Sequence, residues 1–468
     1  MDTPILDMLK KIAASGDARF CMPGHKGKPG FLGGAVNDYD ITELPGADNL
    51  YMPEGPILQS QQLHAEYIGA SHSFFLVNGS SIGVHASILA VLKRGDKVIV
   101  GRDMHLSAIN ALALAGARPL LVHPSASGTE LFGVLTPEDV RRAVLRYPDA
   151  KAVYITYPNY YGLCSDINEI CAVAHRAGMK VICDAAHAAA FDYSDLLPVP
   201  PAAAGCDVWA TSLHKTLPAM NQCAVMSVGT GVEWGTAQAV LNMLQTTSPS
   251  YVLLGSSDYA LGYMRDKGKQ KLAAVIALVE DNIRKIEALG GYRCVTKDVP
   301  VLTGAYDRDI LKLVIDVTDR GISGFSAARS LAKNGICVEA ADSANIVLIC
   351  SVADGQEDLD RLKAALYALK GSNYSIQSKM TAIELAGVFD RQLSMEIGEA
   401  VFGKKRNVPL LESVGEIAAA SVGAYPPGIP VIIPGQKITY DMVDYIARMR
   451  QQGYTVFGSD GNIDIVEG

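Results

Sequence analysis

The chain has 468 residues, of which 49% are hydrophobic and 19% are charged, a balance typical of a globular protein rather than a disordered one. Its 41 lysines and arginines against 49 aspartates and glutamates give a net charge of −8, which argues against nucleic-acid binding. We see no secretion signal and no apolar run long enough to span a bilayer. Nine cysteines without a Cys-x-x-Cys pair, and no metal-ligand cluster, favour a cytoplasmic protein with reduced thiols.

The predicted elements begin with a short helix over Ile5–Ala14 and a Gly- and Pro-rich arm from Pro23 to Gly34. From about residue 55 to 285, apolar strands alternate with helical patterns. Strands are predicted at 73–78, 97–101, 118–122, 151–156, 180–184, 206–211 and 222–228. Helices are predicted at 81–93, 105–115, 136–146 and 166–177. This alternation predicts an α/β domain with a mainly parallel sheet covered on both faces.

A long helical stretch from Ser257 to Leu289 leads to a smaller part of the chain. There, Leu311–Val317 and Asn345–Ser351 are predicted strands, and helices are predicted at 324–334 and 356–370. Gly371–Ser375 is typical of a junction. We therefore expect an N-terminal arm (1–50), a large domain (51–290), a small α+β domain (291–372) and a C-terminal domain (373–468).

Lys215 follows the apolar run Val208–Thr211 and a turn that contains Ser212 and His214. Burying an ammonium costs several kcal/mol unless the charge is paired or lost, so a lysine at the end of a buried strand is an unusual structural choice. The same desolvation favours the neutral amine, which can form a Schiff base with an aldehyde. The alternative is an ordinary surface lysine in a loop, and three segments that precede Lys215 argue against it.

Three upstream segments place complementary groups at the ends of predicted strands. Asp184 ends the strand that contains Val181–Cys183, where a carboxylate can pair with a protonated pyridine nitrogen. Ser80 and Ser81 follow another strand and open a helix, where backbone amides and hydroxyls favour a phosphate ester. His105 follows a third strand, where its ring can lie flat over a cofactor. In chain order, the phosphate site at Ser80 and Ser81, the ring of His105, the carboxylate of Asp184 and the amine of Lys215 describe a site for pyridoxal 5′-phosphate.

The chain resembles the short-form Orn/Lys/Arg decarboxylases, pyridoxal-phosphate enzymes of fold type I, the aspartate-aminotransferase fold. The resemblance covers nearly the whole chain. It rests on Arg19–Gly27, Asp40–Leu50, the segments of Ser80, His105, Asp184 and Lys215, Thr156–Gly162, Thr246–Tyr251 and Tyr425–Pro430.

The resemblance implies a role for each matching residue. Lys215 would carry the cofactor as a Schiff base, Asp184 would bind its pyridine nitrogen, and His105 would stack on its ring. The other cofactor residues implied are Ser80, Ser81, Ser212 and His214 at the phosphate, Ala186 beneath the ring, His187 beside it, and Thr247 and Ser248 from a neighbouring subunit. Residues near His25 and Asp48 would line the partner's substrate pocket, which makes a homodimer or higher homo-oligomer the expected assembly.

The sequence also departs from the family pattern at several positions. The segment Asp184–Ala190 has Ala185 and Ala190 where a carboxylate and a second imidazole are usual, and Asn159 stands where a threonine is usual. Gln436 replaces a glutamate that would pair with a substrate's distal cation. That replacement would weaken the contact, because a neutral amide makes a weaker hydrogen bond than a carboxylate does. We therefore expect a reduced preference for dibasic substrates.

The leading hypothesis is a pyridoxal-phosphate-dependent decarboxylase of an amino acid, with arginine, lysine or ornithine as the implied substrate. Elimination, racemisation and transamination on the same cofactor are alternatives, because fold and cofactor do not fix the reaction. A non-catalytic descendant of the fold is a third hypothesis, favoured by the alanines at 185 and 190 and opposed by Lys215. No metal is expected.

Overall fold

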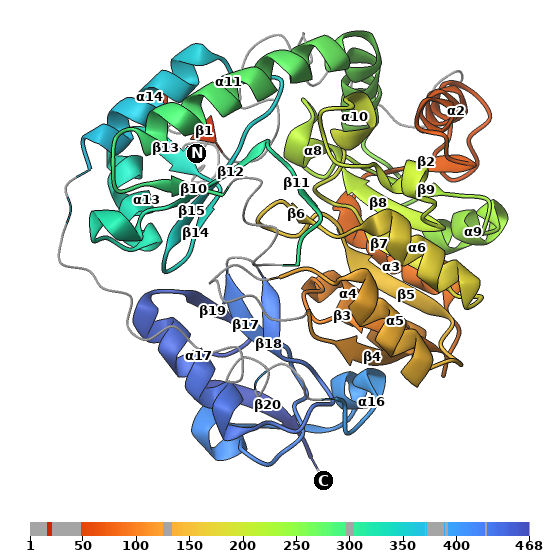
Figure 1. Ribbon diagram of the computed structural model, residues 1–468. Helices are drawn as coiled ribbons and strands as arrows, with labels where there is room; N and C mark the ends of the chain where they lie inside the picture. The colour runs from red at the N-terminus through yellow and green to blue at the C-terminus, as the bar shows by residue number, and fades with distance from the viewer. Residues whose placement is uncertain are drawn as a thin grey trace, which may run out of the picture.

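The computed structural model describes residues 16–20, 48–124, 133–295, 304–369, 371, 388, 392–425 and 428–467. The predicted helix Ile5–Ala14 and the arm Pro23–Gly34 lie outside these residues. Figure 1 shows three groups of elements: the large sheet with its helices, a small α+β group that contains β12, β15, α13 and α14, and a C-terminal group drawn in blue.

A seven-stranded sheet forms the centre of the large domain. In spatial order its strands are β2 (His72–Leu76), β9 (Ala224–Val228), β8 (Val208–Ser212), β7 (Lys180–Asp184), β5 (Ala152–Thr156), β3 (Lys97–Gly101) and β4 (Arg118–Val122). Only β9 runs antiparallel to its neighbours, so the expected mainly parallel sheet is confirmed. Near-continuous apolar runs form these strands because both faces of the sheet are covered.

Helices pack on the two faces of this sheet in separate layers. One apolar core joins the sheet to α3 (Gly79–Val91), α4 (Leu106–Ala115) and α9 (Trp234–Leu244). The opposite core includes α5 (Pro137–Arg146) and α6 (Ile167–Arg176). Residues that alternate along one strand enter different cores: Val98 and Val100 face α3 and α4, whereas Ile99 faces the other layer. The remaining elements of this domain are α2 (Pro56–Ile68), β6 (Leu163–Cys164), η2 (Phe191–Tyr193), α7 (Pro201–Ala204) and α8 (Leu213–Thr216).

The predicted long helical stretch is three consecutive elements, α10 (Tyr251–Tyr263), the π-helical turn η3 (Met264–Gly268) and α11 (Lys269–Glu287). It begins earlier than expected, at Tyr251. It leads to a four-stranded sheet in the order β10 (Arg293–Cys294), β12 (Lys312–Asp316), β15 (Asn345–Ile349) and β14 (Ala340–Ala341). The predicted elements of this part are confirmed, with helices α13 (Gly324–Lys333) and α14 (Gln356–Tyr367).

Two short pairings connect distant parts of the chain. Strand β1 (Ala18–Phe20) pairs in parallel with β13 (Ile336–Val338), which places these three residues beside the small domain. Strand β11 (Asp307–Arg308) pairs with β6, which places the entry to β12 beside the large domain. The 3-10 turn η4 (Thr318–Arg320) follows β12.

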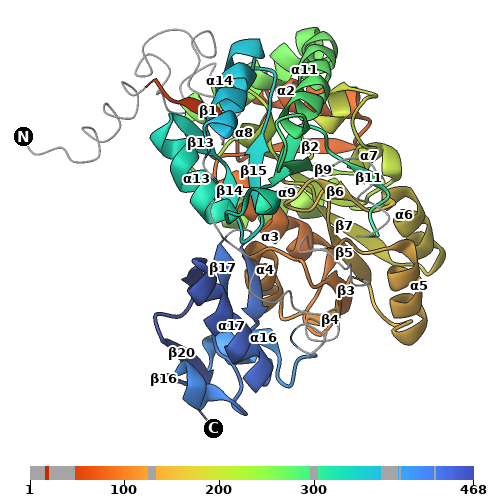
Figure 2. The same cartoon turned by 60° about the vertical axis from the view of Figure 1, so that its left-hand side comes forward.

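The C-terminal group has its own apolar core. It contains the pair β16 (Lys405–Pro409) and β20 (Asn462–Val466), the sheet β18 (Ile429–Ile432), β17 (Val422–Tyr425) and β19 (Thr455–Phe457), helices α16 (Ile397–Phe402) and α17 (Tyr440–Gln452), and the 3-10 turn η5 (Leu410–Ser413). Figure 2 shows that this group lies against the end of the large domain that carries α4 and β4. Buried Arg102 joins the two, donating to the carbonyl oxygens of Pro430 and Val431.

We propose the four-part division with boundaries near 50, 290 and 372, because each of the three larger sheets is built from strands of one part. Within the described ranges, no helix is both long and apolar enough to cross a membrane.

Candidate active site

Lys215 lies in the single helical turn α8, directly after strand β8. Its Nζ is 3.0 Å from Nε2 of His187. Burial lowers the pKa of Lys215, while the carboxylates of Asp184 and Glu339 act in the opposite direction. The desolvated amine is therefore easier to deprotonate than a surface lysine, which is what a nucleophilic lysine requires.

Asp184 is the last residue of β7 and is buried. Its Oδ1 accepts a hydrogen bond from the backbone N–H of Ala186 at 3.1 Å, and its Oδ2 accepts one from the hydroxyl of Tyr154 at 3.2 Å. These two donors fix the orientation of the carboxylate at the carboxyl end of the sheet, where ligands bind in open α/β folds.

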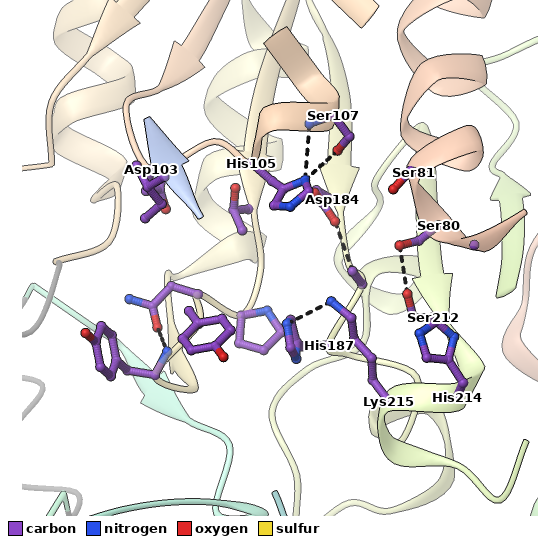
Figure 3. A pocket seen from close by; sticks show the side chains of 18 of the residues that line it. Ser80, Ser81, Asp103, His105, Ser107, Asp184, His187, Ser212, His214 and Lys215 are labelled. Carbon is purple, nitrogen blue, oxygen red and sulfur yellow. Dashed lines mark hydrogen bonds between the residues drawn. The ribbon is translucent and has the colours of Figure 1, made fainter. Parts of the chain in front are cut away.

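The N-terminus of α3 forms the opposite end of the site. Ser80 and Ser81 lie in its first turn, and the hydroxyl of Ser212 donates to Oγ of Ser80 at 2.7 Å. His214 lies beside them, with its Nδ1 2.9 Å from the carbonyl oxygen of Cys223. Figure 3 shows Ser80 and Ser212 side by side, with Ser81 and His214 close to them. Hydroxyls and free backbone amides at a helix N-terminus favour an anionic group such as a phosphate ester.

His105 is the N-cap of α4, so the helix begins at Leu106, one residue later than the predicted start at 105. Its Nδ1 accepts from the backbone N–H of Ser107 at 3.1 Å, so the ring is fixed by the helix that it caps. Burial lowers the pKa of His105, and nearby Lys215 acts in the same direction while Asp184 opposes it. Figure 3 shows the ring between Asp184 and the Ser107 turn.

These groups surround a single cavity of about 430 Å³. Ligand pockets are commonly about 300–1,000 Å³, so this volume suits a small cofactor with a bound amino acid. Three buried polar atoms on its lining residues have no hydrogen-bond partner: Nδ1 of His187, Oδ1 of Asp103 and Oγ1 of Thr156. Such buried polar atoms could make hydrogen bonds to a group bound in the cavity.

The residues fit pyridoxal phosphate. An anion site, a carboxylate and a desolvated amine match the phosphate, the pyridine nitrogen and the aldehyde in turn. Among the residues that the structure describes, no cluster of His, Cys, Asp or Glu could hold a metal ion.

Most of the residues named from the sequence lie around this cavity. They are Ser80, Ser81, His105, Asp184, Ala186, His187, Ser212, His214 and Lys215. Thr247 and Ser248 do not line it; both are exposed in the loop between α9 and α10. Asp48 and Gln436 do not line it either, and His25 lies outside the described residues.

In this chain, the carboxylate of Asp48 forms hydrogen bonds within its own loop. Its carboxylate accepts hydrogen bonds from the backbone N–H groups of Asn49, Glu54, Gly55 and Ile57. Burial alone would raise its pKa, but these four donors together lower it below the ordinary value. The carboxylate therefore stabilises the turn before α2, and any contact with a substrate would have to be made in a partner subunit.

Gln436 is fully buried in the C-terminal group, and its Oε1 accepts from the backbone N–H of Ile433 at 3.0 Å. Gln436 therefore does not line the cavity of its own chain, and a role at the substrate stays a prediction.

Gln436→Glu is expected to destabilise the protein rather than improve its use of arginine or lysine. A carboxylate in a fully buried turn loses its hydration, which costs about 1–3 kcal/mol in the free energy of unfolding. Chemical denaturation of the variant and of the exposed control Gln451→Glu measures this difference. An improved kcat/KM for arginine at unchanged stability would contradict the placement of Gln436.

Several lining residues were given no individual role from the sequence, notably Asp103 and, within segments that carry the family resemblance, Thr156, Tyr160, Tyr425 and Ile429. Asp103 had a local signal, since it follows strand β3 two residues before His105. Burial raises its pKa to about 7. Tyr425 and Ile429 come from the C-terminal group, and their approach depends on tertiary packing that no local pattern records.

The departures at 159, 185 and 190 have structural explanations. Oδ1 of Asn159 accepts from the backbone N–H groups of Tyr161 and Leu163, both at 3.0 Å, and so orders the loop that lines the cavity. Ala185 and Ala190 are buried in the apolar core and do not line the cavity. These three departures therefore leave the groups around the cavity in place.

The chain matches two family models, the Orn/Lys/Arg decarboxylase major domain over residues 3–305 and the C-terminal domain of the same family over 394–464. It is 33% identical to an arginine decarboxylase of Bacillus subtilis, over 98% of this chain and 96% of that protein. It is 32% identical to an arginine decarboxylase of Halalkalibacterium halodurans, over 98% and 95%.

A lysine decarboxylase structure from Francisella novicida superposes with a TM-score of 0.76 at 18% identity, covering 99% of this chain and 81% of that one. This likeness supports the fold-type-I architecture. Fold, site and family models agree: the chain belongs to the Orn/Lys/Arg decarboxylase family and is a pyridoxal-phosphate-dependent amino-acid decarboxylase.

Proposed function

We propose that this enzyme releases carbon dioxide from the α-carboxyl group of arginine and yields the corresponding amine. The observation that supports this is the gathering of Lys215, Asp184 and the Ser80–Ser212 hydroxyl pair around one cavity. Arginine is proposed as the substrate because the two relatives described above, matched over nearly their full length, are arginine decarboxylases.

Each group at the site has a proposed task. Ser80, Ser81, Ser212 and His214 would bind the phosphate, and Lys215 would hold the cofactor through its amine. Asp184 would favour a protonated pyridine nitrogen, and His105 and Ala186 would contact the ring. When bound, pyridoxal phosphate draws away the electron pair that departing carbon dioxide leaves on Cα.

The protein selects the reaction through orientation and proton delivery. The walls of the cavity would orient the bound substrate so that its α-carboxylate, and not another group on Cα, is placed to leave. Lys215 and His105 are the groups proposed to return a proton to Cα, because both face the cavity and burial lowers the pKa of each. For Lys215, a lowered pKa brings the amine closer to the range in which it can exchange protons at neutral pH. For His105 it favours the neutral imidazole, so the role proposed for His105 rests on its position at the cavity.

A panel of amino acids tests this proposal with the purified enzyme and added pyridoxal phosphate. Arginine is expected to give one amine and one carbon dioxide per turnover, with a higher kcat/KM than lysine or ornithine. A keto acid product would indicate transamination, and loss of optical activity without carbon dioxide would indicate racemisation. Either result as the main reaction would overturn the proposal.

We further propose that the enzyme works as a homodimer in which Thr247 and Ser248 approach the phosphate site of the partner. Both side chains are exposed in this chain. Asp48 is linked to the residues that follow them, because its backbone carbonyl oxygen accepts a hydrogen bond from the hydroxyl of Tyr251. Mixing Lys215→Ala with Ser248→Arg tests this, because a hybrid dimer would regain one intact site. No recovery of activity above that of either variant alone would contradict a shared site.

A further inference from the structure

A second lysine is buried next to the active site, and none of the proposed catalytic steps uses it. Lys312 begins strand β12 and is 1% exposed. Its Nζ donates to the carbonyl oxygen of Tyr160 at 2.8 Å and to that of Asn159 at 3.4 Å, and it lies 5.1 Å from the centre of the Tyr160 ring. Burying a charged ammonium is costly, so this position needs an explanation beyond packing.

An ion pair does not provide that explanation. Asp309 is the nearest carboxylate in the sequence, yet its buried Oδ2 has no hydrogen-bond partner. The backbone N–H of Lys312 donates to the carbonyl oxygen of Asp309 at 3.2 Å, but among the described residues no hydrogen bond joins the carboxylate to the ammonium. The hydrogen bonds of the ammonium therefore go to the loop that lines the cavity. Gly162 makes this approach possible, since a Cβ there would lie 3.0 Å from Cβ of Lys312.

A continuous set of contacts leads from Lys312 to the reactive amine. The ring of Tyr160 packs edge-to-face against His187, with 5.8 Å between ring centres and 86° between the planes. Nε2 of His187 is 3.0 Å from Nζ of Lys215, as the dashed line in Figure 3 shows. A neutral imidazole can share a hydrogen bond with this amine, whereas an imidazolium would repel its protonated form.

The groups around His187 favour its neutral state. Burial lowers the pKa of His187 far below the ordinary value, and Lys215, Lys312, His105 and His214 act in the same direction. Burial also lowers the pKa of Lys312 to about 7, opposed by Asp309 and Glu339 and supported by Lys215.

We propose that Lys312 is a positioning residue: its ammonium holds the Asn159–Tyr160 wall against His187 and excludes a second positive charge beside Lys215. The importance of this arrangement for turnover rests on the proposed role of Lys215. The effect of Lys312 on the protonation of His187 does not depend on that role.

The test compares Lys312→Gln, which can still donate to the two carbonyl oxygens but carries no charge, with Lys312→Arg, which keeps the charge. Full-length protein labelled with ring-¹³C histidine is titrated with and without pyridoxal phosphate, and His187→Gln identifies the His187 signal. Lys312→Gln is expected to raise the protonation midpoint of His187 by about one pH unit, while Lys312→Arg leaves it near the wild-type value.

The pH profile of turnover provides the second measurement. Because His187 would take up a proton at higher pH in Lys312→Gln, the acid limb of kcat should move upward by a similar amount. Lys269→Gln, which removes a surface lysine with an 80% exposed side chain, is the matched control and should leave both profiles unchanged.

A purely structural role predicts a different result. Lys312→Gln would then unfold more readily while the His187 midpoint and the acid limb stayed at their wild-type values, and this outcome would overturn the proposal. If Lys312→Gln does not fold, Tyr160→Leu removes the ring that joins the wall to His187, and an unchanged His187 signal there would also overturn it. Failure of the proposed function would give a different result: the wild-type enzyme would release no carbon dioxide from arginine, at any value of the His187 protonation midpoint.

Discussion

Lys215→Ala is expected to lose covalent attachment of pyridoxal phosphate and to lower kcat by several orders of magnitude. The alanine removes both the amine that bonds the cofactor and one of the two groups proposed to move a proton at Cα. Wild-type protein should absorb visible light after addition of the cofactor, and borohydride should fix the label on the peptide that contains Lys215. Peptide mapping of the reduced protein measures this directly.

Two controls make the result specific. Lys269→Ala removes a surface lysine and should retain full labelling and activity. Lys312 is a buried lysine near the cavity, so it is the residue expected to take the label if Lys215 is not the reactive lysine. Labelling of Lys312 in wild-type protein, or normal turnover by Lys215→Ala, would overturn the assignment of Lys215.

The sequence was most informative where chemistry coincides with a strand end. Asp184, Ser212 and His105 lie at or just after the ends of β7, β8 and β3, so their positions follow from the parallel order of the sheet. Apolar strands and the caps of the following helices are local features, and the α/β architecture could be predicted from them.

Residues whose position depends on long-range packing could not be placed in the same way. Gln436 was expected at the substrate, yet it is buried in a turn of the C-terminal group. Lys312 attracted no attention because a lysine at the start of a strand is normally a surface residue. Only the pairing of β11 with β6 brings it beneath the Asn159–Tyr160 loop.

The roles predicted for Thr247 and Ser248 concern the site of a neighbouring subunit. A residue that completes a neighbouring subunit's site is exposed in its own chain, and both of these side chains are exposed here. Exposure therefore fits the expected role without testing it, and the hybrid-dimer experiment is needed to decide.

Asp184→Asn is expected to retain the cofactor and lose most of its turnover. Asparagine has nearly the same shape, and its amide oxygen can still accept from the backbone N–H of Ala186 or from the hydroxyl of Tyr154. It cannot supply the negative charge that keeps a proton on the pyridine nitrogen, so the ring would withdraw electrons less strongly from Cα. Turnover should therefore fall by orders of magnitude, far more than cofactor affinity does.

Tyr154→Phe is the matched control for Asp184→Asn, because it removes one hydrogen bond to the carboxylate but leaves its charge. Its turnover should fall much less, because the carboxylate keeps its charge and its hydrogen bond from the backbone N–H of Ala186. Stopped-flow absorbance and the rate of carbon dioxide release distinguish the two effects at saturating cofactor. If Asp184→Asn and Tyr154→Phe lose the same small amount of activity, the charge of Asp184 does not hold the ring nitrogen's proton, and the neighbouring carboxyl of Asp103 becomes the group to replace next.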